Sequence, residues 1–150
     1  MKYSAFQFIC AALTGASLAV SLLFRFCDLL TYLSAVALPL IAALILIIIS
    51  ERKHPEWKRF NRSLDTWRLY AVKAAVFFAA YFVFLSFPQL HADGRITPGP
   101  AIIAMLLADF VYRLIISGKL EFDRLGTVDA VLEKHPEAEK YFNTNSRTGK

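Results

Sequence analysis

The sequence predicts an all-α, polytopic membrane protein with four transmembrane helices. Of its 150 residues, 57% are hydrophobic, whereas a soluble domain is usually roughly 45–50% apolar. Four apolar runs each have about the length that crosses ~30 Å of hydrocarbon. A basic segment, residues 51–68, separates the second run from the third. Together these observations predict two antiparallel helical hairpins, joined by a cytoplasmic amphipathic segment and followed by a short helical tail.

The first predicted span is residues 5–24. A cleaved signal peptide is the alternative, because Ser17-Leu18-Ala19 resembles a small-residue cleavage site. The apolar run continues past Ala19 and totals about 20 residues, so we favour an uncleaved spanning helix. Small residues recur at helical spacing along this span and would allow another helix to approach closely; they are Ala12, Gly15, Ala16 and Ala19.

The second predicted span is residues 29–50. Only residues 25–28 separate it from the first span, so the two helices are expected to form an antiparallel hairpin. Pro39 lies near its middle, where a bilayer tolerates a kink if neighbouring groups satisfy the freed carbonyl. The stretch from Leu40 to Ile49 is almost entirely Ile, Leu and Ala. We therefore expect this half of the helix to face lipid or to pack through apolar contacts alone.

The basic segment between the second and third spans has a helical apolar face. Pro55 suits the first turn of a helix, and the apolar residues that follow are spaced by three, four and three. Such a helix lies in the plane of the lipid headgroups, or it packs its apolar face on the cytoplasmic ends of the bundle; both interpretations stay open, and they do not exclude each other. The predicted membrane-interface residues are Trp57, Lys58, Arg59, Phe60, Arg62, Leu64, Trp67 and Arg68.

The third and fourth predicted spans are residues 69–87 and 100–117. The third is rich in aromatic residues, and Phe87-Pro88 is expected to end it. It also carries a ridge of small residues four apart, Ala71, Ala75 and Ala79. The fourth span has prolines near its start and Gly118 at its end, as helix termini often do.

Three ionisable residues lie well inside these apolar runs, namely Lys73, Asp109 and Arg113. A charge at the bilayer centre costs roughly 2.5–3.5 kcal/mol, so each needs a partner or a route to water. Asp109 and Arg113 are four apart and share a helical face, and Lys73 on the neighbouring helix is expected to reach towards Asp109. The cluster is either a structural ion pair or triad, or a proton or cation site. We favour the structural interpretation, because Asp109 is already supplied with cations and no second carboxylate lies in the spans.

Residues 119–150 are predicted to form a cytoplasmic tail beyond a transmembrane domain of residues 1–118. Apolar residues recur about every three positions from Phe122 to Val131 or Leu132, which predicts a short amphipathic helix. Thr127 is expected to cap one of its turns, and Pro136 to start a further helical piece.

The distribution of basic residues predicts the orientation. Lys2, the basic segment and the tail carry most of them, whereas the opposite loops have only Arg25 and Arg95. Basic residues beside spans stay on the cytoplasmic side, so both termini are expected in the cytoplasm of a bacterial-type inner membrane. The net charge of +5 is then explained by orientation and by attraction to anionic headgroups, and nucleic-acid binding is not expected.

The sequence contains no pattern for enzymatic or cofactor chemistry. His54, His91 and His135 all lie outside the spans, which removes the paired intramembrane histidines of a b-type haem. Cys10 and Cys27 would be ~25 Å apart along one helix, beyond disulfide reach. Phosphate-loop, GxSxG and HExxH patterns are absent. We therefore expect a non-enzyme without metal or cofactor.

These observations favour a small inner-membrane protein that acts by helix–helix interaction with another membrane protein or with a second copy of itself. An immunity protein against a pore-forming toxin and an accessory subunit of a membrane complex are examples with this architecture. The alternative is a small transporter or an ion- or proton-translocating subunit that uses Asp109. A third possibility is lipid sensing by the segment from Trp57 to Trp67.

Overall fold

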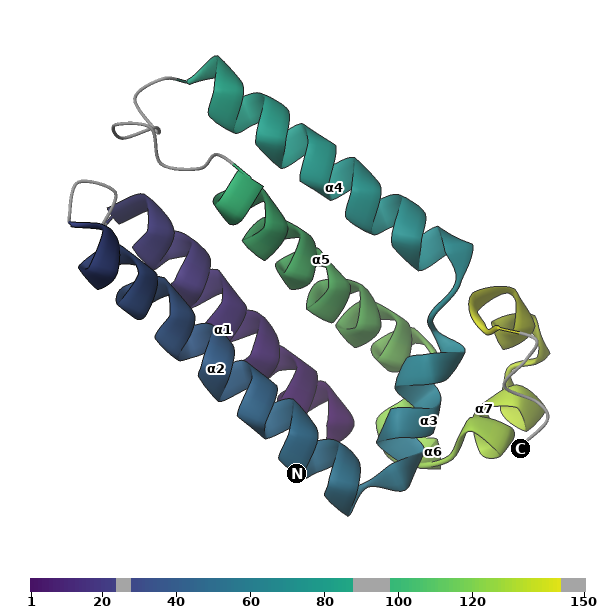
Figure 1. Ribbon diagram of the computed structural model, residues 1–150. Coiled ribbons are helices and arrows are strands. Elements are labelled where there is room, and N and C mark those ends of the chain that lie inside the picture. The colour runs from purple at the N-terminus through teal and green to yellow at the C-terminus, as the bar shows by residue number, and fades with distance from the viewer. Residues whose placement is uncertain (24–27, 88–97, 144–150) are drawn as a thin grey trace.

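The computed structural model describes residues 1–23, 28–87 and 98–143, and no strand occurs among them. Four helices are long and apolar enough to cross a membrane, which confirms an all-α chain with four candidate spans. They are α1 (Tyr3–Leu23), α2 (Leu29–Lys53), α4 (Trp67–Ser86) and α5 (Pro98–Lys119); the shorter elements are α3 (Pro55–Ser63), α6 (Phe122–Leu125), α7 (Val128–Lys134) and the 3-10 helix η2 (Pro136–Tyr141) (Figure 1).

The long helices extend beyond the apolar runs at most of their ends. α1 and α4 each begin two residues before the predicted spans, and α2 continues through Arg52 and Lys53. Basic side chains in a last helical turn are favourable because they face the negative end of the helix dipole. At its start, α2 is capped by Asp28, whose carboxylate accepts a hydrogen bond from the Thr31 backbone N–H at 3.0 Å.

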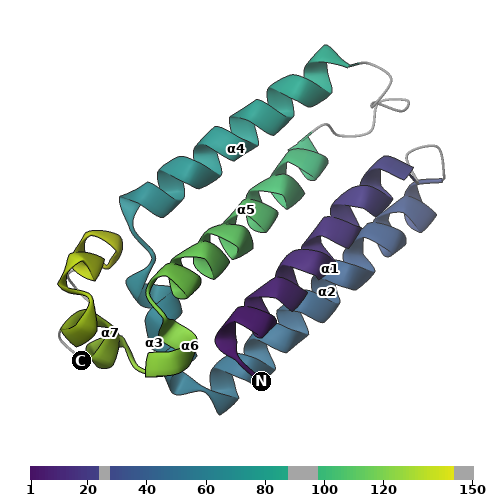
Figure 2. The ribbon, with the colours of Figure 1, turned by 180° about the vertical axis from the view of Figure 1, so that it is seen from behind.

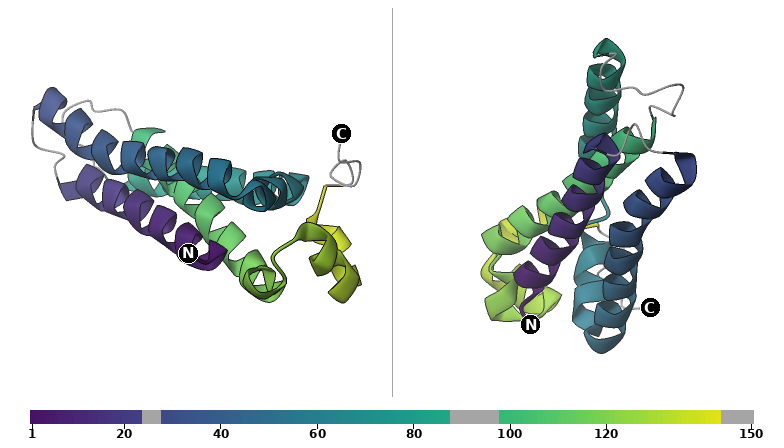
Figure 3. Two further views of the ribbon diagram at one scale, coloured as in Figure 1. Left: turned by 90° about the horizontal axis from the view of Figure 1, so that it is seen from below. Right: turned by 90° about the vertical axis from the view of Figure 1, so that its left-hand side faces the viewer.

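α1 and α5 form the centre of the helix bundle. α1 packs along both α2 and α5, and α4 packs along α5, so that α2 and α4 lie on the outside. From behind and in the right-hand view of Figure 3, α1 is seen between α2 and α5 (Figures 2 and 3). The neighbours α1–α2 and α4–α5 are the pairs predicted to form hairpins, although the connections at 24–27 and 88–97, with Arg25, Cys27, His91 and Arg95, lie outside the described residues.

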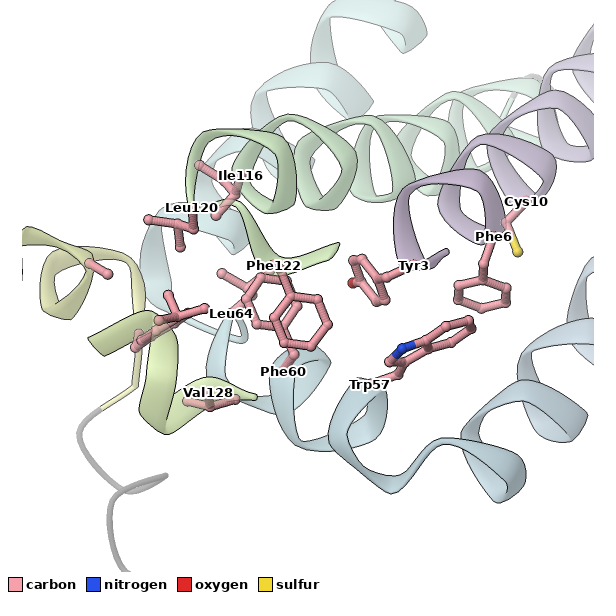
Figure 4. Packing of buried hydrophobic residues seen from close by; sticks show 13 residues of the cluster. Tyr3, Phe6, Cys10, Trp57, Phe60, Leu64, Ile116, Leu120, Phe122 and Val128 are labelled. Atoms are coloured by element: carbon pink, nitrogen blue, oxygen red, sulfur yellow. The ribbon is translucent and has the colours of Figure 1, made fainter. Parts of the chain in front are cut away.

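The buried apolar cluster lies at one end of the bundle, where α3, α6, α7 and η2 meet the long helices; we call this the capped end. Figure 4 shows its aromatic centre. The rings of Phe60 and Phe122 stack with centroids 3.9 Å apart, and Tyr3 meets Phe60 edge-on at 5.2 Å. The cluster comprises Tyr3, Phe6, Cys10, Trp57, Phe60, Leu64, Ile116, Leu120, Phe122, Val128, Val131, Ala138 and Phe142.

Away from the capped end, the outer helices expose their apolar side chains. Only Ala43 and Ser50 of α2 and only Leu69 and Phe84 of α4 are buried. Leu30 is 76% exposed. Large contiguous apolar surfaces are rare on monomeric soluble proteins, whereas a bilayer covers them with hydrocarbon. The arrangement therefore fits a multi-pass membrane protein.

The apolar face of the basic segment packs against protein. Trp57, Phe60 and Leu64 belong to the buried cluster, as expected if this face packs on the ends of the bundle, and the position of the helix relative to lipid headgroups stays a prediction. The spacing identified the face correctly, but α3 ends at Ser63, and Trp67 begins α4 with 75% of its surface exposed. A residue pattern defines a helical face without defining what covers that face.

The C-terminal segment shares the same buried cluster. Gly126, with φ of 76°, separates α6 from α7, so the predicted amphipathic stretch is two short helices. Thr127 caps α7 as predicted, since its hydroxyl accepts a hydrogen bond from the Ala130 backbone N–H at 3.2 Å. The Asn143 backbone N–H donates to the Ser63 carbonyl at 2.7 Å. The division of the chain into a transmembrane domain and a tail at residue 118 stays a prediction. In the structure, the described part of the tail is anchored on α3 by this hydrogen bond.

Candidate functional site

The capped end contains a polar cluster centred on Arg113 of α5, which is buried with 8% of its surface exposed. Its guanidinium donates from Nε to Asp109 Oδ2 at 3.0 Å, from Nη2 to Asp65 Oδ1 at 2.8 Å, and from Nη1 to the Asn61 carbonyl at 2.7 Å. The planar fork of an arginine suits such divergent acceptors. Arg113 therefore connects α5 to the end of α3 and to the turn after it.

Lys73 joins this cluster from α4. Its Nζ lies 3.0 Å from Asp109 Oδ1, so each oxygen of the Asp109 carboxylate has a cationic partner. The ammonium also lies 5.3 Å from the centre of the Tyr70 ring. The structure thus brings Lys73, Asp109 and Arg113 together, and the resulting contacts hold α4 on α5.

Asp65 completes the charge balance of the cluster. With it, two cations face two carboxylates at ion-pair distance. A buried charge is tolerated when it is paired and its remaining donors are satisfied. Sequence reasoning missed Asp65 as a member, although one signal pointed to it: Lys73 and Arg113 outnumber the single carboxylate in the spans. The excess positive charge required a further acid nearby.

A second polar chain passes through Asn61 and was also missed. The Tyr3 hydroxyl donates to Asn61 Oδ1 at 2.5 Å, and Gln7 Nε2 donates to the Tyr3 oxygen at 2.8 Å. Asn61 Nδ2 in turn donates to Glu51 Oε1 at 3.2 Å. Through Asn61 and Arg113, the polar contacts of α1, α2, α3, α4 and α5 form one continuous network. Single polar residues near the ends of apolar runs give no sequence signal for such a network.

Arg59, a predicted interface residue, forms a surface pair with the tail. Its two terminal nitrogens lie 2.9 and 3.1 Å from the Asp129 carboxylate, and this hydrogen bonding raises the pKa of Arg59. The carboxylate side chain is 72% exposed, and surface pairs contribute about 0–1 kcal/mol. The contact orients α7 against α3 more than it stabilises the fold. Lys58, Arg62 and Arg68 are exposed, and their predicted contact with headgroups stays a prediction.

An open cavity of about 390 Å³ lies beside the polar cluster. Asp109, Arg113 and Asp65 line one part of it, together with Gln7 and Asn61. Gln7 is buried, with 1% of the residue exposed, and its Oε1 atom has no hydrogen-bond partner among the described residues.

The contacts of the cluster fit a structural role, in which they hold the helices together, better than they fit a reactive site. Both Asp109 oxygens and every nitrogen of the Arg113 guanidinium are engaged. In residues 1–23, 28–87 and 98–143, no group of three or more His, Cys, Asp or Glu side chains could hold a metal ion. No protein-family model, no curated protein and no solved structure matches the chain.

Proposed function

We propose that this chain is a non-enzymatic inner-membrane protein that binds another membrane protein through outward-facing helix surfaces. An immunity protein against a pore-forming toxin or an accessory subunit of a membrane complex would act in this way. The proposal is supported by the position of the small residues, which lie on the outside of the bundle.

The ridge of small residues on α4 faces away from α5. Ala71, Ala75 and Ala79 are all exposed, and they are flanked by Phe78 and Phe82, which are 66% and 70% exposed. Small residues at this spacing allow two helix backbones to approach closely. The adjacent phenylalanines would add apolar contact area around such a crossing.

A second set of small residues on α1 also faces outward. Ala12, Ala16 and Ala19 are exposed, and a Cβ atom added to Gly15 would meet no other atom within 4 Å. Packing within this chain therefore does not require these side chains to be small. This observation carries the proposal, because a partner helix supplies the reason for their size.

The ion cluster supports the same function by fixing α4 in place. α4 is an outer helix with only two buried residues, yet Lys73 ties it to Asp109 on α5. A helix held at one side by an ion pair presents its opposite face in a defined orientation. In this account the charges are positioning groups for the α4 surface.

The proposed orientation places the capped end in the cytoplasm. Exposed basic residues of this end include Lys58 and Arg62 of α3 and Arg68 in the first turn of α4. Basic residues beside spans stay on the cytoplasmic side, where anionic headgroups attract them. Both termini would then also be cytoplasmic.

Enlarging the α4 ridge is expected to release the partner. The double variant Ala75→Leu, Ala79→Leu should reduce the partner recovered in mild detergent by about tenfold, equivalent to ~1.4 kcal/mol of association energy, because a close helix crossing is blocked. The ridge is exposed, so the variant should still fold. The measurement is quantitative co-purification from native membranes, with crosslinking to detect a second copy of the chain.

Ala42→Leu on α2 is the matched control, since Ala42 is exposed on a helix without such a ridge. It should leave recovery unchanged. Full recovery of the partner with the α4 double variant would contradict the proposal, as would a wild-type protein that is always recovered alone and monomeric.

The second candidate function is a small transporter or an ion- or proton-translocating subunit. The observation that favours it is the open cavity that reaches Asp109. It predicts that Asp109→Asn removes flux while the protein still inserts and folds. The two cationic partners of Asp109 favour the first candidate.

A further inference from the structure

The cavity beside the polar cluster lies between α2 and α5. Both helices pack on α1, which is seen between them in the right-hand view of Figure 3, and α3 supplies the lining at the capped end. The volume of about 390 Å³ is within the range of ligand pockets, roughly 300–1,000 Å³. The cavity is open to the surface, so a ligand reaches it without unfolding of the helices.

The charges on the inner side of the cavity neutralise one another. Arg113 is paired with both Asp109 and Asp65, and Lys73 of α4 is the second cation on Asp109. Two cations therefore face two carboxylates, and together these four side chains have no net charge. Because they are engaged with one another, they do not supply a charge for a ligand.

Two basic side chains of α3 remain. Lys58 and Arg62 are exposed, line the cavity and are one helical turn apart, so they share a face of α3. In the part of the chain that the structure describes, neither of them has an ion-pair partner. The other charged residue of the lining is Glu51, which accepts a hydrogen bond from Asn61 Nδ2 at 3.2 Å. Two positive charges and one negative charge leave an excess of one positive charge, which matches the single negative charge of a phosphodiester.

The lining becomes apolar towards the middle of the bundle. Leu106 and Phe110 are one turn apart on α5, and Ile47 precedes Glu51 by one turn on α2. Both helices run towards the capped end (Figure 1), so the lower-numbered residues lie deeper in the span. At ~1.5 Å per residue, Leu106 is ~10 Å further from the capped end than Arg113. From the capped end inward, the lining therefore changes from basic to apolar.

We propose that this cavity binds one anionic phospholipid of the phosphatidylglycerol class, whose headgroup carries a phosphodiester and no ammonium. Lys58 and Arg62 hold the phosphate at the capped end. One acyl chain extends inward along Ile47, Leu106 and Phe110. The order of groups in such a lipid, with the phosphate joined through glycerol to the chains, is the order of the lining. A headgroup ammonium would cancel the charge that the two cations bind, and a phosphate without chains would leave the apolar wall uncovered.

A built site of this kind differs from the general attraction of a basic surface for anionic headgroups. General attraction follows the number of nearby basic residues, whereas this site holds one lipid per chain and requires the residues of the lining. It goes beyond the proposed protein partner, because binding of the lipid needs no second protein. Lipid binding and partner binding are measured separately, so either can fail without the other.

Lipid competition on the purified full chain tests the proposal. The protein in neutral detergent micelles is incubated with equal amounts of phosphatidylglycerol, phosphatidylethanolamine and phosphatidylcholine of identical chains, and bound lipid is counted by native mass spectrometry. We expect one phosphatidylglycerol per chain, retained about tenfold over each of the other lipids, and no retention of glycerophosphoglycerol, which lacks the chains. Equal retention of the three lipids, preference for a lipid with an ammonium, or retention of the chain-free headgroup would overturn the proposal.

A charge variant separates the site from general attraction. Arg62→Gln should lower the retention of phosphatidylglycerol about tenfold, because one of the two phosphate-binding cations is lost. Arg52→Gln is the matched control, since Arg52 is also an exposed arginine but lies outside the cavity lining, and it should leave retention unchanged. An equal loss in the two variants would show that only the total basic charge matters and would overturn the proposal.

A second variant tests the position of the acyl chain without a change of charge. Leu106→Trp should lower the retention of phosphatidylglycerol about tenfold, because the larger side chain fills the apolar part of the cavity. Ile102→Trp is the control, since Ile102 lies one turn away on α5, is 44% exposed and is outside the lining. A folded Leu106→Trp protein with full retention would overturn the proposal. If this variant does not fold, the lipid competition and the two arginine variants still decide it.

Discussion

The substitution Arg113→Met is expected to lower the free energy of unfolding by about 3–5 kcal/mol. Arg113 is the only side chain of the described network that contacts Asp109, Asp65 and the Asn61 carbonyl together. Its removal leaves the carbonyl without this donor and the Asp65 carboxylate without its cation. The largest of these losses is electrostatic, because α5 and the α3 end would then present acidic groups to each other in a partly buried region.

Unfolding by denaturant in mixed micelles, followed by circular dichroism, measures this loss. Arg68→Met is the matched control, because Arg68 is exposed on α4, and it should change stability by less than about 0.5 kcal/mol. Arg113→Lys should be nearly as harmful as Arg113→Met, since one ammonium does not reproduce a planar fork with divergent donors. A stability of Arg113→Met within error of wild type would show that the network does not hold the helices together.

The substitution Asp109→Asn is expected to lower stability by about 2–3 kcal/mol and to reduce the amount of protein in the membrane. The amide no longer neutralises Lys73, whose side chain is 21% exposed, while Arg113 keeps Asp65. If the role of Asp109 is structural, adding Lys73→Met should restore part of the lost stability, because the unpaired ammonium is removed. Glu133→Gln, at an exposed position of α7, is the control for loss of a carboxylate.

Abundance and ion flux should be measured on the same Asp109→Asn membranes. We expect low abundance of the variant, no specific flux in either the wild type or the variant, and recovery of abundance with Lys73→Met. A variant with wild-type abundance that has lost a measurable wild-type flux would support the transporter function instead. In that outcome the cavity beside Asp109 would be its access route.

The long helices could be predicted from sequence because their signal is local. A run of apolar residues of membrane length defines a span wherever the neighbouring helices lie, and the observed helices differ from the predicted spans by only a few residues at their ends. The proximity of Asp109 and Arg113 is equally local, since it follows from one turn of a helix. Lys73 could be added to this pair because it lies on α4, the long helix that precedes α5 in the chain and was expected to pack against it.

The capped end depends on contacts between distant segments, and these have no local signal. Tyr3, Phe60 and Phe122 meet although they are far apart in the chain. The spacing of Trp57, Phe60 and Leu64 indicates an apolar face, but the same spacing suits burial in lipid or in protein. This face is buried in protein because the tail and the start of α1 supply aromatic and aliphatic side chains that pack against it.

The polar residues of the network were missed for a related reason. Gln7, Asn61 and Asp65 each occur singly, so no periodic pattern marks them. Their roles come from the position of Arg113, which is set by the packing of α5 against α1 and by its hydrogen bonds to Asn61 and Asp65. An excess of cations within the spans was the sequence feature that indicated a missing acid.

A topology reporter fused after Lys150 tests the central claim most directly, namely that the chain crosses the membrane four times with its capped end in the cytoplasm. Fused in turn to a fluorescent protein that matures only in the cytoplasm and to a phosphatase active only outside it, the full chain should give fluorescence and no phosphatase activity. Phosphatase activity without fluorescence would place the capped end outside the cell and contradict the account.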